Sequence, residues 1–397
     1  MPDSDDLQQQ ATQTYEQLKG NFQSDTSMWR LGNTLDTLLD YVAEVDPTAA
    51  GEVAELAMDK FQMLDGAWFD DYAWWGIASV KASQMQFPAV PPNKPGPYTW
   101  NFKRIAQSMW GIMDGNAPYA WERATPADQT AYSPRYEGGV WNGDWPGSRW
   151  NAGFAVQEEG GGLSGIQNTV TNGLYLVLAS RLYLASGTEA YLNSARREFG
   201  FLHTWFDHPD PALRLLDRQG EHAALVRERV SVVGGATDPY FQANLHWAGD
   251  QGLVLGGLVD LMSAMGPTHP DDYQALLALA RTIMKGVRTN LSVLDVLNPW
   301  TPGQNAPGGD PADYFTGIGV YMRYLLYAFR NNPDLAADMA AEDYQSFLLA
   351  NVANPYPDPS YPPDSMTENT NKLAVLLAAI AVSAASPAPA GGGAAAT

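Results

Sequence analysis

The chain of 397 residues contains no cysteine. Disulfide frameworks, thiolate nucleophiles and cysteine-ligated metals are therefore excluded. The five histidines are scattered and form no HExxH or paired metal-ligand spacing, so the sequence predicts neither a catalytic metal nor a cofactor. A glycine-rich phosphate loop after a strand and a GxSxG motif are also missing. Nucleotide-dependent and serine-hydrolase chemistry thus have no support in the sequence.

Positive charge is scarce, with 23 lysines and arginines against 44 acidic residues and a formal net charge of −21. Such an acidic field repels phosphate backbones and anionic lipids, so we expect neither a nucleic-acid nor a membrane partner. No apolar run approaches the roughly 18 residues of a membrane span. The start, MPDSDDLQQQ, has neither the basic nor the apolar segment of a signal peptide. As written, the chain is predicted to be cytoplasmic; if a leader is missing, the protein is secreted.

What the chain does contain is apolar and aromatic side chains, 45% hydrophobic residues and 11% aromatic ones, which suffice for a sizeable core. Its 13 tryptophans and 19 tyrosines suit a protein that handles sugars, because flat aromatic faces stack on the C–H faces of pyranose rings. Large all-α domains also use tryptophan to fill their cores. Composition leaves both interpretations open.

Amphipathic stretches of helical period recur from end to end, about a dozen in all. They begin near Leu7, Leu31, Ala49, Asp70, Phe102, Asn168, Ala190, Gly249, Tyr273, Ala312, Ala341 and Met366. The clearest strand candidate covers residues 224–233. An even number of helices favours paired inner and outer helices in an all-α (α/α)6 barrel, although a helical solenoid has the same periodicity. We expect one domain over residues 1–386 and a disordered low-complexity tail, PAPAGGGAAAT, over 387–397.

The long irregular regions are rich in tryptophan and glycine, which favours ordered loops that build a site. They cover residues 88–100, 120–167, 207–248 and 296–310. Trp141, Trp145 and Trp150 lie in one of these loops and are predicted to stack on sugar in the binding subsites. The alternative is that the loop packs its tryptophans against the rim of the barrel.

The adjacent carboxylates Asp70 and Asp71 lie among aromatic residues where a loop meets a predicted helix over residues 72–83. Glycoside hydrolysis needs two carboxyl groups. Aromatic surroundings raise the pKa of a carboxyl group, and a helix N-terminus favours its ionised form, so the pair is able to divide the two roles. The competing interpretation is helix N-capping, for which aspartate is a preferred residue.

A second polar group lies on the predicted helix that starts near Asn168. Asn168, Asn172 and Tyr175 follow the spacing i, i+4, i+7 and share one helix face. Two amides and a phenol that face a cavity are able to hold sugar hydroxyls. The alternative is a polar stripe that faces solvent.

Six blocks, in order over about 300 residues, resemble glycoside hydrolase family 76, the α-1,6-mannanases. They are residues 68–78 (WFDDYAWWGIA), 103–117 (KRIAQSMWGIMDGNA), 138–142 (GGVWN), 167–174 (QNTVTNGL), 250–258 (DQGLVLGGL), and 315–318 (FTGI) with 322–325 (MRYL). The first is similar to the family's Asn-Asp-Asp-x-x-(Trp/Phe)-Trp-Gly signature. Each block alone is weak, and their succession is specific.

The resemblance implies an (α/α)6 barrel of the six-hairpin glycosidase type that cleaves α-mannosidic linkages with retention. It implies Asp70 as nucleophile and Asp71 as acid/base. The substrate-binding residues that we predict are Trp74, Trp141, Trp145, Asn168, Asn172, Tyr175, Asp250, Gln251 and Arg323. The expected partner is an α-linked mannan or related oligosaccharide, and the expected state is a monomer.

Two other functions stay open. One is a glycan-binding (α/α)6 protein that has lost turnover. The other is a sugar 2-epimerase type of isomerase with histidine acid/base chemistry, because His246 precedes the helix that contains Gln251. Cleavage of a glycoside, binding without cleavage, and conversion of a free monosaccharide distinguish the three.

Overall fold

The computed structural model of the chain describes residues 4–61, 64, 68–87, 98–115, 139–140, 142, 156–157, 163–164, 168–209, 211, 214–228, 245–266, 269–304, 311–354 and 364–385. The predicted tail over residues 387–397 lies outside these ranges. So do Trp141, Trp145 and Trp150 of the predicted sugar-stacking loop.

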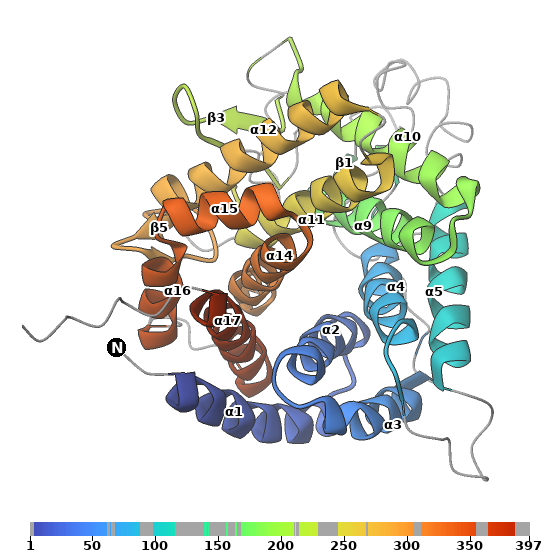
Figure 1. Cartoon of the computed structure of the whole chain (residues 1–397). Coiled ribbons are helices and arrows are strands. Elements are labelled where there is room, and N and C mark those ends of the chain that lie inside the picture. Colours follow the sequence, from blue (N-terminus) through green and yellow to red (C-terminus); the bar gives the residue numbers. More distant parts are fainter. Residues whose placement is uncertain are drawn as a thin grey trace, which may run out of the picture.

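Six inner helices form a closed ring in which each helix contacts the next and the last contacts the first (Figure 1). In order, they are α2 (Met28–Glu44), α4 (Phe69–Ser83), α9 (Thr169–Ser186), α11 (Ala248–Met265), α14 (Gly317–Asn331) and α17 (Ser365–Ala385). The contact between α17 and α2 closes the ring. The prediction of an (α/α)6 barrel is therefore confirmed, and the solenoid is wrong.

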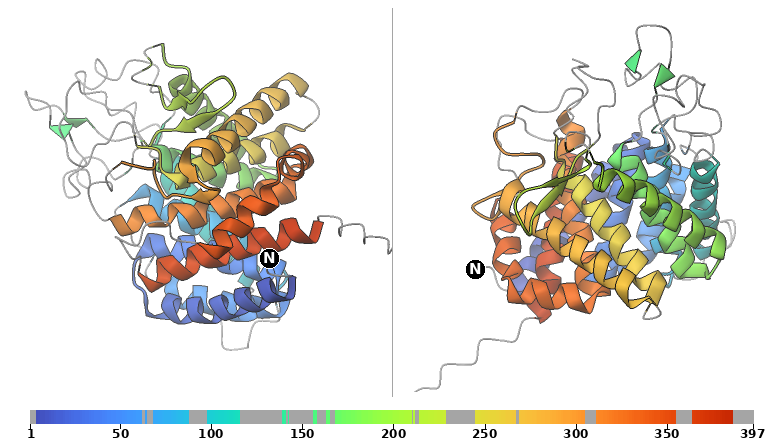
Figure 2. Two further views of the ribbon diagram at one scale, coloured as in Figure 1. Left: turned by 90° about the vertical axis from the view of Figure 1, so that its left-hand side faces the viewer. Right: turned by 90° about the horizontal axis from the view of Figure 1, so that it is seen from above.

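Outer helices pack against this ring, as the two side views show (Figure 2). They are α1 (Ser4–Ser24), α3 (Ala50–Lys60), α5 (Tyr98–Asp114), α10 (Glu189–Phe206), α12 (Pro270–Gly286), α15 (Pro333–Ala341) and α16 (Tyr344–Ala353). The first helix, α1, packs on the last, α17, so the two ends of the helical sequence meet. In the described part of the chain, no helix is both long and apolar enough to cross a membrane.

Short elements complete the description. The helical turns are η1 (Pro47–Ala49), η6 (Val287–Leu291) and α13 (Pro311–Phe315), and the antiparallel strand pairs are β1 (Val156–Gln157) with β2 (Leu163–Ser164), β3 (Leu216–Arg218) with β4 (Ala224–Val226), and β5 (Ser292–Val293) with β6 (Val296–Leu297). The predicted strand over 224–233 is thus described only as β4, and residues 229–233 lie outside the described ranges.

The predicted helix starts agree with the structure except in the last third of the chain. The helix expected from Ala312 is split, because α13 ends at Phe315 and α14 begins at Gly317. A Cβ on Gly317 would lie 2.3 Å from the indole nitrogen of Trp247, so only glycine allows this close approach. The helix α15 was missed: the Asn332 side chain caps it by accepting from the Leu335 N–H, with Pro333 in its first turn.

The inner helices are apolar around most of their circumference, which is why they lie inside the ring. Every residue of α11 from Ala248 to Met262 is buried. Two glycines bring α11 against α14: a Cβ on Gly252 would lie 2.8 Å from the Tyr321 backbone, and one on Gly256 would lie 2.2 Å from the Tyr324 ring. Close packing of these helices therefore depends on small residues.

Charged side chains cross the middle of this apolar ring and pair with one another. Arg323 on α14 contacts Asp36 on α2 at 2.7 Å, and both are buried. Its remaining nitrogens donate to the Asn33 carbonyl and amide oxygens and to the Thr37 hydroxyl. Lys81 on α4 pairs with the same Asp36. Burial alone would raise the pKa of Asp36, but the charges of Lys81 and Arg323 hold that pKa below its ordinary value.

A second buried ion pair joins two helices on the other side of the ring. Arg181 on α9 contacts Asp260 on α11 at 3.1 Å, and the Tyr327 hydroxyl on α14 donates to the same carboxylate. The Arg181 guanidinium also lies over the Tyr327 ring, 4.1 Å from its centre. The two groups together link five of the six inner helices.

We expect Arg323→Leu to lower the free energy of unfolding by about 3 kcal/mol or more, because it removes a cation from the buried Asp36. Arg330→Leu, on the same helix, is the matched control. Arg330 is 45% exposed in its pair with Glu44, so its loss should cost about 1 kcal/mol or less. Urea unfolding followed by circular dichroism measures both, and equal losses would contradict a central role for Arg323.

Candidate active site

The two adjacent aspartates lie in the first turn of α4. The helix begins at Phe69, three residues before the predicted start at Tyr72. Its N-cap residue is Trp68, which has extended backbone and makes no side-chain cap. Neither aspartate therefore occupies the N-cap position, and the capping interpretation is wrong. Both carboxyl groups lie in the first turn, where the backbone N–H groups have no partner within the helix and the helix favours negative charge.

The two carboxyl groups differ in environment. Asp71 is buried, and Asp70 is partly exposed. Burial, the negative charge of Asp70 and that of Asp313 together raise the pKa of Asp71 to about 8. Asp71 is therefore protonated at neutral pH. A protonated carboxyl group beside a second carboxyl group is the combination that acid-assisted glycosidic cleavage needs.

Asn142 connects the start of α4 to the start of α9. Its carbonyl accepts from the Phe69 N–H at 3.0 Å, and its side-chain oxygen accepts from the Asn168 amide at 3.0 Å and the Thr171 hydroxyl at 3.2 Å. These bonds hold the backbone directly before the Asp70–Asp71 pair.

Glu228 and Tyr314 extend this set of hydrogen bonds to the neighbouring helices at the same end of the barrel. The Glu228 carbonyl accepts from the Thr169 N–H at 2.8 Å, at the start of α9. The Tyr314 hydroxyl donates to the Glu228 carboxylate at 2.9 Å, and the Tyr314 carbonyl accepts from the Trp247 indole at 2.8 Å. The starts of α4, α9, α11 and α14 therefore meet around one mouth of the barrel.

Sequence reasoning missed Asp313, Tyr314 and Glu228. Asp313 and Tyr314 directly precede the FTGI block, and that proximity was the available signal. Glu228 lies in a loop with no motif. Only the folded ring brings it to Tyr314, which is 86 residues away in the sequence.

The group Asn168, Asn172 and Tyr175 is buried, so the solvent-facing alternative is wrong. Asn168 caps α9 by accepting from the Thr171 N–H at 3.2 Å. The Asn172 amide bonds both the N–H and the carbonyl of Val140, and the Tyr175 hydroxyl donates to Asp114 at 2.5 Å. In the structure these side chains hold protein segments near the mouth. Their contact with a sugar stays a prediction.

Asp250 and Gln251 lie buried at the start of α11. The Gln251 amide accepts from the Val226 N–H at 2.7 Å and donates to the Val226 carbonyl at 2.7 Å. It therefore holds β4 against α11, as Asn172 holds the backbone at Val140. Sugar contacts of Asp250 and Gln251 also stay predictions.

Trp74 lies one turn after Asp70 and is buried, with the Arg323 guanidinium 5.9 Å from the centre of its ring. Arg323 itself is only 2% exposed, and its nitrogens are bonded to α2. The structure thus places both residues in the interior of the ring. Their predicted contact with substrate is untested.

His246, the residue behind the epimerase alternative, has two protein partners. Its ring nitrogens lie 2.9 Å from the Thr301 hydroxyl and 3.1 Å from the Asp217 carboxylate. Burial lowers the pKa of His246, against the opposing charge of Asp217. Over the described ranges, no group of three or more histidine or acidic side chains is arranged to hold a metal ion.

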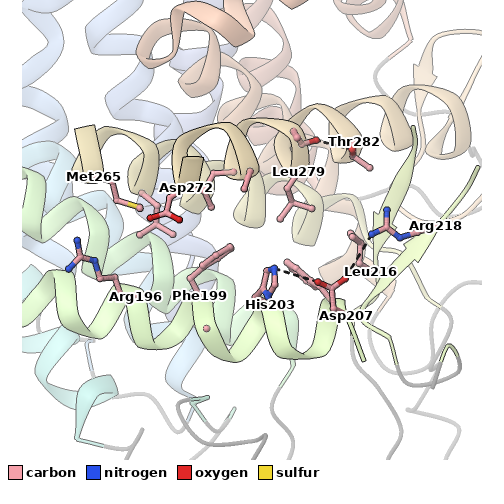
Figure 3. Close-up of a pocket in the computed structure, with 16 residues that line it drawn as sticks. Arg196, Phe199, His203, Asp207, Leu216, Arg218, Met265, Asp272, Leu279 and Thr282 are labelled. Carbon is pink, nitrogen blue, oxygen red and sulfur yellow. Dashed lines mark hydrogen bonds and ion pairs between the residues drawn. The ribbon is translucent and has the colours of Figure 1, made fainter. Parts of the chain in front are cut away.

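A groove of about 640 Å³ lies elsewhere, between the outer helices α10 and α12 (Figure 3). Phe199 and His203 line it from α10, and Leu279 and Thr282 line it from α12. None of the predicted site residues lines this groove. It is therefore separate from the Asp70–Asp71 pair.

No family model matches the sequence. Sequence relatives include the mannan endo-1,6-alpha-mannosidases DCW1 of two yeasts. The Candida glabrata protein is 26% identical over 197 residues, which are 50% of this chain and 34% of that protein. The Saccharomyces cerevisiae protein is 23% identical over 262 residues, 64% of this chain and 48% of that protein. The chain thus spans about a third to a half of the length of these relatives.

Solved structures share the fold over nearly the whole chain. Dfg5 from Chaetomium thermophilum, in complex with glucosamine, has a TM-score of 0.65 at 17% identity and covers 95% of this chain and 90% of its own. An inactive variant of the α-1,6-mannanase GH76A of Salegentibacter sp. HEL1_6, in complex with α-1,6-mannotriose, has a TM-score of 0.61 at 16% identity and covers 95% and 99%. The chain is thus similar in sequence to the DCW1 mannosidases, and it shares its fold with glycoside hydrolase family 76 α-1,6-mannanases.

Proposed function

We propose that the protein is a retaining glycoside hydrolase that cleaves α-mannosidic linkages, α-1,6-linked mannan above all, with Asp70 and Asp71. The observation that carries the proposal is the adjacent pair at the mouth of the barrel, in which Asp71 is buried with a pKa of about 8. The α-1,6-mannanase variant that binds mannotriose is inactive and has two consecutive aspartates replaced by asparagine, which supports the same pair here.

In this mechanism the ionised Asp70 attacks the anomeric carbon while Asp71 gives its proton to the departing oxygen, and the glycosidic C–O bond breaks. A covalent ester between the sugar and Asp70 forms. Asp71, now ionised, takes a proton from water, and the resulting hydroxide attacks the anomeric carbon. The ester bond breaks, Asp70 regains its charge and Asp71 its proton.

We expect Asp70→Asn and Asp71→Asn each to lower kcat/KM on α-1,6-mannan oligosaccharides by about 10³-fold or more, because each removes a group that acts on the reacting atoms. Chromatography of the released sugars measures the effect. Asp271→Asn, an exposed aspartate in the first turn of α12, is the control and should retain full activity. Undiminished release by both site variants would reject the assignment.

The same assay separates the alternatives. Binding of mannan oligosaccharides by the unmodified protein without turnover indicates the glycan-binding protein. Conversion of a free monosaccharide that depends on His246 indicates the isomerase.

The pH dependence of kcat/KM should report the raised pKa of Asp71. The acid must be protonated, so we expect activity to persist through neutral pH and to fall as pH rises through about 8. Initial rates between pH 4 and 10 test this expectation. An alkaline limb centred near pH 4–5, the range of an ordinary carboxyl group, would contradict the assignment of Asp71 as the acid.

The raised pKa also predicts a stability effect. Between about pH 4 and pH 8, folded Asp71 holds a proton that the unfolded chain has released, so the free energy of unfolding falls as pH rises through this range. Asp71→Asn removes this dependence and should stabilise the protein by on the order of 5 kcal/mol at pH 8 and by less than about 1 kcal/mol at pH 4. Urea unfolding at both pH values tests it; an equal effect at both would show that Asp71 is not buried in its protonated form.

A further inference from the structure

The helix α4, which carries Asp70 and Asp71, does not cap its first turn with a side chain of its own. Its N-cap residue Trp68 makes no side-chain cap, and the Phe69 N–H donates instead to the Asn142 carbonyl at 3.0 Å. The first N–H groups of a helix have no partner within it, so an acceptor from another segment helps to fix where the first turn lies. The position of the two aspartates therefore depends on what holds Asn142.

Asn142 is held through its side chain by the first turn of α9. Its amide oxygen accepts from the Asn168 amide at 3.0 Å and from the Thr171 hydroxyl at 3.2 Å. Asn168 is fixed in turn, because its own amide oxygen accepts from the Thr171 N–H at 3.2 Å and caps α9. Asn168 and Thr171 are both buried, which limits the competition of water for these bonds. The helix α9 therefore holds Asn142 at two points and, through it, the start of α4.

The Thr171 hydroxyl is used differently from threonine hydroxyls further along other helices. On α1, α10 and α12 they donate to the carbonyl four residues earlier in their own helix: Thr12 to Gln8, Thr204 to Gly200, and Thr282 to Ala278. Thr171 is the third residue of α9, so the carbonyl four residues earlier lies before the helix. Its hydroxyl bonds Asn142 instead, and the Thr169 hydroxyl likewise donates to the Arg227 carbonyl at 2.6 Å. The first turn of α9 thus uses two hydroxyl groups to hold other segments of the mouth.

Resting on the proposed function, we propose that Asn142 and Thr171 are positioning residues of the active site: together they set where the first turn of α4 presents its two aspartates to the sugar. Neither residue has to touch the reacting atoms. The path of bonds runs from the Thr171 hydroxyl to the Asn142 side chain, and from the Asn142 carbonyl to the Phe69 N–H. Because a catalytic group misplaced by about 1 Å costs up to about 10²-fold in rate, a small shift of this turn lowers turnover while the barrel stays folded.

The test compares Thr171→Val, which keeps the shape of the side chain but removes the hydroxyl, with Thr171→Ser, which keeps the hydroxyl. We expect Thr171→Val to lower kcat on α-1,6-mannan oligosaccharides about fivefold with KM within about twofold, and Thr171→Ser to restore kcat to within about twofold. Amide hydrogen exchange at Phe69, followed by NMR, should be about fivefold faster in Thr171→Val and unchanged in Thr171→Ser. Asn142→Ala removes both side-chain bonds and should change kcat and exchange further in the same direction.

Asn351→Ala is the matched control. It removes a buried amide that accepts from the Leu297 N–H at 2.8 Å on the outer helix α16, and it should change neither kcat nor the exchange at Phe69. Equal exchange rates in Thr171→Val and Thr171→Ser, or equal kcat values in an active protein, overturn the proposal. Failure of the proposed function looks different, because the unmodified protein then releases no sugar. The exchange at Phe69 needs no turnover, and it alone then decides whether the two residues hold α4.

Discussion

The barrel depends on the buried carboxylate of Asp36 and the two cations that reach it from other helices. Lys81 of α4 and Arg323 of α14 both contact Asp36 of α2, so one anion links three inner helices. Burying such a charge is costly unless its partners are in place, so this arrangement penalises any ring in which these helices are displaced. The ion pairs and the close glycine contacts between α11 and α14 together fix how the inner helices lie against one another.

A recurring pattern of hydrogen bonds holds non-helical segments against the helices of the barrel. A helix side-chain amide bonds the backbone N–H and carbonyl of a nearby non-helical segment. Asn172 holds Val140, Gln251 holds Val226, and Asn351 of α16 accepts from the Leu297 N–H and donates to the Asp295 carbonyl. Buried extended backbone needs such partners, because it lacks the bonds of a helix. The amides thus allow irregular loops to lie against apolar helices.

Charged side chains are arranged differently in the interior of the ring and at its mouth. Inside the ring, Asp36 and Asp260 are buried and each pairs with a cation. At the mouth, Asp70, Asp71 and Asp313 lie near one another, and the result is a raised pKa on Asp71. Lys81 is about 16 Å further along α4 than Asp70 at the helical rise of 1.5 Å per residue, which is too far to neutralise the pair. The helix turns that carry the stabilising ion pairs are therefore different from the turns whose charges raise the pKa of Asp71.

The sequence by itself determined the helices, because a period of 3.6 residues is a local property of the chain. It also determined the position of Asp70 and Asp71 at the start of a helix, since the aromatic flanks and the ordered blocks are contiguous in sequence. Ring closure was decided only by the tertiary structure, as it rests on the contact between α17 and α2. The same holds for Arg323, whose buried partners Asn33 and Asp36 lie almost 300 residues away, and for Asp313 beside Asp71. Burial and charge proximity depend on which distant helices become neighbours, and no local pattern records that.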